Sequence, residues 1–165
     1  MPLPFIKRPG NDKGYEATTM TDSKPIARSD YKLFYPITTR WMDNDVYGHV
    51  NNVTYYSYFD SAVNRYLIEQ GGLDIQNAPV VGYVVNSSCS YLSGIAYPDE
   101  IEAGLRVNKL GNSSVTYGVG IFKKGEDTAC AFGDFIHVFV NRAENKSVPM
   151  PAQIRSALEK LLIAQ

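Results

Sequence analysis

The sequence has few of the cysteine and histidine residues that form disulfides in small secreted proteins or bind metal ions. It contains only two cysteines, Cys89 and Cys130, and both lie in apolar stretches where a free thiol behaves as a small hydrophobic group. Its two histidines, His49 and His137, are far apart in the sequence and have no cysteine partner, which argues against a structural zinc site. We therefore expect a reduced protein with no metal and no cofactor.

Long apolar runs and an imbalance of charge are absent as well. No stretch of about 18 apolar residues occurs, and the N-terminal segment carries charges early and lacks the apolar core of a signal peptide. Lys and Arg number 16 against 17 Asp and Glu, so the net charge is −1, whereas a nucleic-acid-binding protein normally has a basic excess. These absences predict a cytoplasmic protein with neither a membrane nor a nucleic-acid partner.

The chain is rich in tyrosine and in ordinary hydrophobic residues. Tyrosine occurs 12 times against a single tryptophan, and 44% of the residues are hydrophobic. Tyrosine favours strands and half-buried surfaces, so an all-helical protein is disfavoured. A length of 165 residues predicts one domain. Prolines and glycines without periodicity mark residues 1–30 as an irregular N-terminal arm, dispensable for chemistry, ahead of a single domain over residues 31–165.

Hydrophobic periodicity predicts one long helix after a first strand. Residues 31–42 are aromatic and β-branched, which predicts a strand, and Pro36 suggests that the beginning of this strand lies at an edge. Residues 52–70 repeat apolar side chains at three- and four-residue spacing, which predicts a helix that ends at Gly71-Gly72. The predicted apolar face of that helix comprises Val53, Tyr56, Phe59, Val63, Tyr66 and Leu67.

The remainder is typical of an antiparallel meander followed by a short helix. The expected strands are 80–92, 101–108, 115–121 and 128–141. The last of these is apolar enough to lie inside the sheet, and Pro149 and Pro151 then introduce a short helix. Because strands and helices do not alternate, this order favours an α+β fold over a doubly wound parallel sheet.

The densest group of polar side chains lies between the first strand and the long helix. It comprises Asp43, Asn44, Asp45, Gly48, His49, Asn51 and Asn52. Polar residues before a helix are commonly N-caps, and Asn51 or Asn52 can fill that role. Asp43 and Asp45 lie too far upstream to be needed as caps, which is a mild indication of function. The first N–H groups of a helix can polarise a carbonyl, while a nearby carboxylate attacks it or activates water. Together they form a minimal acyl-transfer site.

The string D-x-D-x-x-G-H-V-N-N over residues 43–52, followed by Tyr55 and by Tyr-Phe at 58–59, resembles the hot dog-fold thioesterases. The likeness is closest to the 4-hydroxybenzoyl-CoA thioesterase branch and the related acyl-acyl-carrier-protein thioesterases, and it covers about residues 31–142. It implies a long central helix wrapped by a five-stranded antiparallel sheet, with subunits paired so that their sheets are continuous. It therefore implies a homodimer or homotetramer that hydrolyses a small-molecule acyl-CoA at sites between subunits.

The resemblance also implies roles for residues of this chain. Asp45 matches the catalytic carboxylate, which acts as a nucleophile or as a general base, and His49 matches a position that orients substrate or water. The residues expected to bind the substrate are Gly48, Val50, Asn51, Asn52 and Tyr55. Backbone N–H groups around Asn51 and Asn52 would polarise the thioester carbonyl. Asp43 is expected to hold the loop, and the same purely structural role stays open for His49.

Other polar residues are weaker candidates, for which an ordinary structural role is the simpler interpretation. Ser87, Ser88 and Ser90 interrupt an apolar strand and could border a pantetheine arm. The cations that could meet the phosphates of CoA are Arg106, Lys109, Lys123 and Lys124. Asp134 and His137 fall on opposite faces of one strand, so they do not form an obvious dyad.

Three other functions stay open on the sequence alone. An acyl-acyl-carrier-protein thioesterase would use the same chemistry but would need a basic docking surface, which the near-neutral net charge does not indicate. A hydratase of the same fold would rely on a histidine with an acidic partner, whereas this segment has the thioesterase pattern. A non-catalytic acyl-CoA-binding protein would not need Asp45, and residues 1–30 are too short and irregular for a DNA-binding unit.

Overall fold

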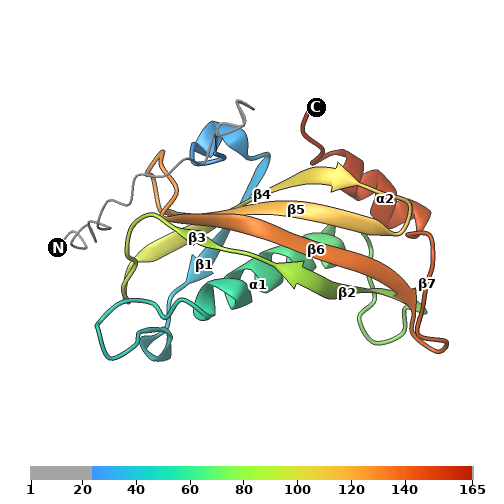
Figure 1. The fold of residues 1–165 in the computed structure, drawn as a ribbon, viewed down its shortest axis with the longest axis horizontal. Helices are drawn as coiled ribbons and strands as arrows, with labels where there is room; N and C mark the ends of the chain where they lie inside the picture. The colour runs from blue at the N-terminus through green and yellow to red at the C-terminus, as the bar shows by residue number, and fades with distance from the viewer. Residues whose placement is uncertain (1–23, 165) are drawn as a thin grey trace, which may run out of the picture.

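The computed structural model describes residues 24–164, so most of the expected N-terminal arm lies outside the described residues. An antiparallel sheet curls around one long helix, α1 (Thr54–Glu69), as Figure 1 shows. The main strands are β1 (Leu33–Thr38), β2 (Val80–Ser87), β4 (Glu100–Leu110), β5 (Ser114–Lys123) and β6 (Ala131–Asn141). The shorter elements are strands β3 (Ser90–Tyr91) and β7 (Lys146–Ser147) and helix α2 (Ala152–Glu159).

The strand order is β1-β4-β5-β6-β2, and every neighbouring pair is antiparallel. Strands β1 and β2 are therefore the edges, and β6 lies inside the sheet as its apolar sequence predicts. The predicted α+β fold, with a long helix wrapped by five main strands, is confirmed. The sheet gains two further strands because β3 and β7 pair with β6, and each is too short to give a periodic signal.

The core lies between α1 and the inner face of the sheet. The buried residues of α1 are Tyr55, Tyr58, Phe59, Ala62, Val63, Tyr66 and Leu67. The predicted helix face is thus largely right, but Val53 is wrong, because it is 62% exposed and precedes the first helical turn. On β4 the alternation is as predicted, with Ile101, Ala103, Leu105 and Val107 buried.

Two of the predicted strands end earlier than the periodicity suggests. The strand expected over 31–42 stops at Thr38, because Asp43 accepts a hydrogen bond from the N–H of Arg40 and closes a 3-10 turn. The strand expected over 80–92 breaks into β2 and β3. The break follows a register shift in β2, and there the N–H of Ser88 bonds to the carbonyl of Asp134 at 2.9 Å.

The described end of the N-terminal arm hydrogen-bonds to the domain. The N–H of Ala129 donates to the carbonyl of Ile26 at 2.7 Å, and the N–H of Arg28 donates to that of Asp127 at 2.8 Å. The ring of Tyr31 then lies flat over Gly120 of β5, where a Cβ atom would come within 2.6 Å of it. Residues 26–31 therefore cover part of the outer face of the sheet.

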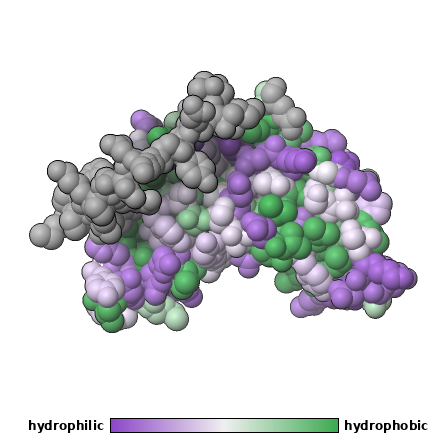
Figure 2. Space-filling view, viewed as in Figure 1, coloured by the Kyte–Doolittle hydropathy of each residue, from purple (hydrophilic) through white to green (hydrophobic). Residues whose placement is uncertain are grey.

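Exposed apolar side chains concentrate on edge strand β2 and on the loop before α1. Figure 2 shows apolar side chains gathered over β2 and β6 on the face turned to the viewer. The exposed members on β2 are Tyr83, Val84 and Val85, and those on the loop are Trp41, Met42, Val46 and Tyr47. Exposed apolar groups of this kind, next to an open sheet edge, are typical of surfaces that meet another chain.

The buried His137 makes stability depend on pH. It is 1% exposed, and burial lowers its pKa to about 4, so it is neutral in the folded chain. The unfolded chain protonates this side chain below a pKa of about 6.5. The free energy of unfolding should therefore fall as pH drops from about 6.5 to about 4, by up to about 3 kcal/mol from this residue.

Urea unfolding at pH 7 and pH 4.5 tests this for the wild type and for His137→Phe. The variant keeps an aromatic ring but cannot take up a proton, so it should lose less stability on acidification than the wild type. An equal loss in both proteins would show that other groups set the acid sensitivity.

Candidate active site

A buried carboxylate fixes the loop that joins β1 to α1. Asp43 is 2% exposed, and its Oδ2 accepts hydrogen bonds from the Arg40 N–H at 2.9 Å and from the Tyr58 hydroxyl at 2.7 Å. The guanidinium of Arg40 pairs with Oδ1 at 3.1 Å, and the backbone carbonyl of Asp43 accepts the N–H of Asn51 at 2.8 Å. These contacts tie both ends of the loop to α1, in agreement with the loop-holding role expected of Asp43.

Asp45 lies in a tight turn within this loop. Its N–H donates to the carbonyl of His49 at 2.8 Å, and its carbonyl accepts the N–H of Gly48 at 3.1 Å. Gly48 has a φ of +82°, a conformation that other residues rarely adopt, so the turn requires glycine as the sequence predicts. The Asp45 carboxylate accepts the N–H of Tyr47 at 2.8 Å through Oδ1, while Oδ2 has no hydrogen-bond partner among residues 24–164.

A second segment, residues 91–97, closes around the loop from the sheet side. The N–H of Val50 donates to the carbonyl of Ile95 at 2.7 Å, and the N–H of Tyr97 donates to Oδ1 of Asn44 at 3.0 Å. Gly94 lies so near His49 that a Cβ atom there would come within 2.8 Å of the imidazole Cδ2. The absence of a side chain at Gly94 therefore makes room for the imidazole.

Most of the predicted site residues share one pocket. It has a volume of about 370 Å³ and is lined by Asp45, Tyr47, His49, Val50, Asn52, Tyr55, Tyr91, Ser93 and Gly94. A wider hollow of about 780 Å³ adjoins it on the other side of Asp45, and Gly48 and Asn51 line that hollow. Asp45, Tyr47 and Asn52 line both, so they lie where the two spaces meet. The structure therefore brings together all seven residues that the sequence marked as catalytic or substrate-binding.

Tyr91 is a pocket residue that sequence reasoning missed. Its hydroxyl donates to the backbone carbonyl of Asn52 at 2.9 Å, and its ring meets that of Tyr55 edge-on at 5.1 Å between centroids. Burial raises the pKa of Tyr55 and of Tyr91 above the ordinary tyrosine value, so both phenols stay protonated. The sequence marked Tyr91 only as part of a strand, since nothing local shows that β3 reaches the helix start.

The beginning of α1 differs in detail from the expectation. The N–H of Asn51 is occupied by Asp43, and the Asn51 side chain accepts the N–H of Val53 at 3.2 Å, closing the turn one residue before the helix. Val53 itself is the N-cap residue and makes no side-chain cap. The N–H of Asn52 has no hydrogen-bond acceptor among the described residues. Of the two predicted backbone donors, Asn52 is therefore the one free to meet a carbonyl.

The weaker candidates separate into three groups. Lys123 and Lys124 pair with Asp99 and Glu100 at 3.7 and 3.2 Å, so they are engaged by carboxylates. His137 is enclosed in the core, on the opposite face of β6 from the exposed Asp134, as the alternation predicts. Four of the weaker candidates line one hollow on the outer face of the sheet: Ser88, Ser90, Arg106 and Asp134.

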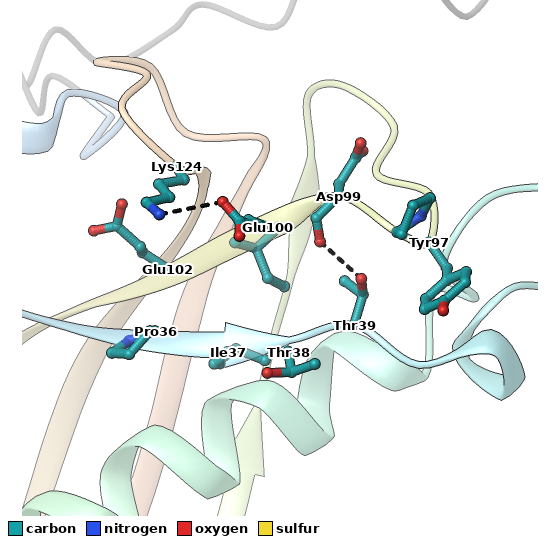
Figure 3. Close-up of a pocket in the computed structure, with 11 residues that line it drawn as sticks. Pro36, Ile37, Thr38, Thr39, Tyr97, Asp99, Glu100, Glu102 and Lys124 are labelled. Atoms are coloured by element: carbon teal, nitrogen blue, oxygen red, sulfur yellow. Dashed lines mark hydrogen bonds and ion pairs between the residues drawn. The ribbon is translucent and has the colours of Figure 1, made fainter.

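A separate cavity of about 440 Å³ lies between β1 and the start of β4, as Figure 3 shows. The hydroxyl of Thr39 donates to the carbonyl of Asp99 at 2.7 Å there, and the ion pair between Lys124 and Glu100 crosses its rim. Each carboxylate of this cavity is held in an ion pair: Glu100 pairs with Lys124, Asp99 with Lys123 and Glu102 with Arg28. No histidine or cysteine lines the cavity. It offers no arrangement for acyl transfer.

Among residues 24–164, no group of three or more His, Cys, Asp or Glu side chains is arranged to hold a metal ion. In the same part of the chain, no helix has both the length and the apolar character that crossing a membrane requires.

The curled antiparallel sheet around one long helix is the hot dog fold. The profile of the thioesterase-like superfamily matches residues 39–158, and the chain belongs to that superfamily. The predicted resemblance to hot dog-fold thioesterases is thereby confirmed, while the 4-hydroxybenzoyl-CoA branch stays a prediction. Membership supports thioester hydrolysis as the general activity.

Three solved structures illustrate the likeness. The PA5185 protein of Pseudomonas aeruginosa strain PAO1 is 56% identical, with a TM-score of 0.82 over 83% of this chain and 96% of that one. The PA2801 protein of the same species, for which a thioesterase function has been proposed, is 32% identical, with a TM-score of 0.70 over 76% and 96%. A 1,4-dihydroxy-2-naphthoyl-CoA thioesterase from Synechocystis is 18% identical, with a TM-score of 0.70 over 78% and 96%, and shares the fold.

Tyr58→Phe tests the hydrogen bonds that hold the loop. The substitution removes one donor to the buried Asp43 carboxylate, so it should lower the free energy of unfolding by about 1–3 kcal/mol. Tyr97→Phe, at a position 40% exposed, is the matched control and should change stability by no more than about 0.5 kcal/mol. Equal effects in urea unfolding of the two variants would show that the Tyr58–Asp43 contact does not support the loop.

Proposed function

We propose that the protein hydrolyses an acyl-CoA thioester to a free acid and CoA at the pocket between Asp45 and the start of α1. The observation that carries the proposal is that Asp45 and Asn52 line the same pocket, and that one carboxylate oxygen of Asp45 and the N–H of Asn52 have no hydrogen-bond partner among the described residues. A carboxylate and a carbonyl-polarising donor at one place are the two groups that acyl transfer needs.

The chemistry follows from these groups. The thioester carbonyl accepts the N–H of Asn52 near the positive end of α1, which stabilises the oxyanion as it forms. In one route the Asp45 carboxylate attacks the carbonyl carbon and expels the CoA thiolate, and water then hydrolyses the resulting acyl-aspartyl anhydride to release the acid. In the other route Asp45 removes a proton from the attacking water and passes it to the departing CoA thiolate. Both routes give free acid and CoA thiol. His49 lines the same pocket, where Gly94 leaves room for its ring, and it can orient the substrate or the water.

Asp45→Asn tests the role of the carboxylate. The amide keeps the size of the side chain but cannot act as base or nucleophile, so kcat on the best acyl-CoA should fall by about 10²–10⁴-fold. KM should change little, because the helix start and the pocket walls remain. The variant should melt close to the wild type, since the Asp45 side chain accepts a single exposed hydrogen bond.

Asp43→Asn is the matched control, because it makes the same chemical change two residues away. The Asp43 carboxylate is buried and accepts hydrogen bonds from several donors, so the main effect of this variant should be a lower melting temperature. Near-normal kcat in a folded Asp45→Asn protein would contradict the assignment and direct attention to His49 or to a residue of a neighbouring subunit.

The rival activities differ in what they would require of the site. A hydratase would need His49 to have an acidic partner, and the Asp45 carboxylate makes no hydrogen bond to that imidazole in the described residues. A carrier-protein thioesterase would need a basic surface beside the pocket, whereas the exposed residues around it are mainly apolar. Acyl-CoA hydrolysis is therefore the activity these contacts favour.

We also propose that two copies of the chain pair through β2. This strand is a sheet edge with exposed apolar side chains, and the loop that carries Asp45 exposes further ones at Trp41 and Tyr47. Pairing β2 with a second β2 would continue the sheet and cover both groups. It would also turn the open hollow beside Asp45 into a site between subunits.

Light scattering at micromolar concentration tests the pairing. We expect a mass of two or four chains of 18.4 kDa each, and Val84→Lys, which adds a charge to the exposed face of β2, should shift the protein toward monomer. Lys109→Glu on β4, away from that edge, should leave the mass unchanged. A single-chain mass for the wild type would contradict the proposal.

A further inference from the structure

The outer face of the sheet carries a polar hollow that the catalytic chemistry does not use. Its volume is about 450 Å³, and it is lined by Lys24, Pro25, Ser88, Ser90, Arg106, Asn108, Phe132, Gly133 and Asp134. Arg106 and Asn108 alternate with the buried residues of β4, so their side chains lie on the face turned away from α1. The hollow is thus on the opposite side of the sheet from the core.

A missing side chain on the neighbouring strand makes this hollow possible. Gly118 of β5 lies beneath Arg106 and Asn108, and a Cβ atom there would come within 2.9 Å of both Nε of Arg106 and Oδ1 of Asn108. The two long side chains can therefore lie flat on the sheet. Nε and Oδ1 are both buried, and neither has a hydrogen-bond partner among the described residues.

The charges around the hollow favour an anionic ligand. Arg106 donates one long hydrogen bond, 3.3 Å, to the carbonyl of Asp30, and no carboxylate within residues 24–164 forms an ion pair with it. The Asp134 carboxylate brings one negative charge to the lining, and its Oδ1 accepts a hydrogen bond from the side-chain amide of Asn108 at 3.0 Å. Lys24 adds a second positive charge, and Ser88 and Ser90 add hydroxyl groups at the rim. A guanidinium with hydroxyl neighbours is well suited to phosphate.

The hollow and the catalytic pocket share one short segment of chain. Residues 88–93 line both, with Ser88 and Ser90 facing the outer hollow and Tyr91 and Ser93 facing the Asp45 pocket. Adjacent residues of an extended chain point to opposite faces, which accounts for the division between Ser90 and Tyr91. The segment pairs with β6 through β3, so the two spaces lie on either side of one extended piece of chain.

We propose that this hollow binds the phosphate-bearing part of the substrate's pantetheine carrier, while the thioester lies at Asp45. The inference rests on the proposed function. Arg106 holds a phosphate oxygen, Lys24 adds to the positive potential, and the amide groups of the pantetheine arm pass Ser90. Phosphate at the end of a pantetheine arm is common to CoA and to acyl carrier proteins, and the hollow recognises that shared chemistry.

The test compares Arg106→Gln with the wild type on one acyl group attached to three carriers: CoA, pantetheine 4′-phosphate and pantetheine without phosphate. We expect the variant to raise KM for the acyl-CoA by about tenfold, because one charge-assisted hydrogen bond is lost, and to change kcat little. KM for the acyl-pantetheine should be unchanged, because that substrate has no phosphate. Arg106→Lys should restore part of the affinity by keeping the charge.

Lys109→Gln is the matched control, since Lys109 is an exposed cation on the same strand but does not line the hollow. Thermal melts of all variants confirm that they are folded. A raised KM for the acyl phosphopantetheine as well would assign the contact to the 4′-phosphate that both carriers share, and a raised KM for acyl-CoA alone would assign it to the nucleotide.

An unchanged KM for acyl-CoA, or an equal rise with the acyl-pantetheine, would overturn the proposal. These outcomes are distinct from failure of the proposed function, in which the wild type would hydrolyse none of the three thioesters.

Discussion

The site depends on one buried carboxylate, that of Asp43. A charged group that is almost wholly enclosed is costly unless its oxygens are satisfied, and here a backbone N–H, a guanidinium and the Tyr58 hydroxyl satisfy them. These contacts end β1, turn the chain and attach it to α1. The tight turn around Asp45 and the free N–H at Asn52 are set by that anchor. Asp43 and Asp45 therefore differ in role although they are two positions apart. The carboxylate of Asp43 holds the loop, whereas that of Asp45 keeps one oxygen free of hydrogen bonds to the described residues.

Features that depend on neighbouring residues could be predicted from the sequence, whereas features that depend on contacts between distant residues could not. The period of α1 and the alternation on β4 are local, and both were predicted correctly. The ends of β1 and β2 were not, because contacts to Arg40 and to the carbonyl of Asp134 end them. The loop motif located the pocket, but Tyr91 and Gly94 were missed, since their importance arises only when residues 91–97 fold back onto the loop.

The two faces of the sheet serve different purposes. The inner face is filled by apolar side chains against α1, whereas the outer face has glycines on β5 where Tyr31, Arg106 and Asn108 lie flat. The sequence did not predict these contacts, because a glycine in a strand indicates a close approach but does not identify the side chain that approaches. In the proposed binding mode, the acyl group lies in the Asp45 pocket at the start of α1 and the charged carrier lies on the outer face, with residues 88–93 between them.

Hydrolysis of an acyl-CoA at the Asp45 pocket is the proposal on which the other assigned roles depend. The most direct measurement is release of free thiol from a panel of aromatic and aliphatic acyl-CoAs, followed continuously with the wild-type protein. Steady turnover of at least one acyl-CoA, with free acid and CoA formed in equal amounts, is the result that the account predicts. Tight binding of acyl-CoAs without thiol release from any of them would contradict it and would indicate a binding protein on the same fold.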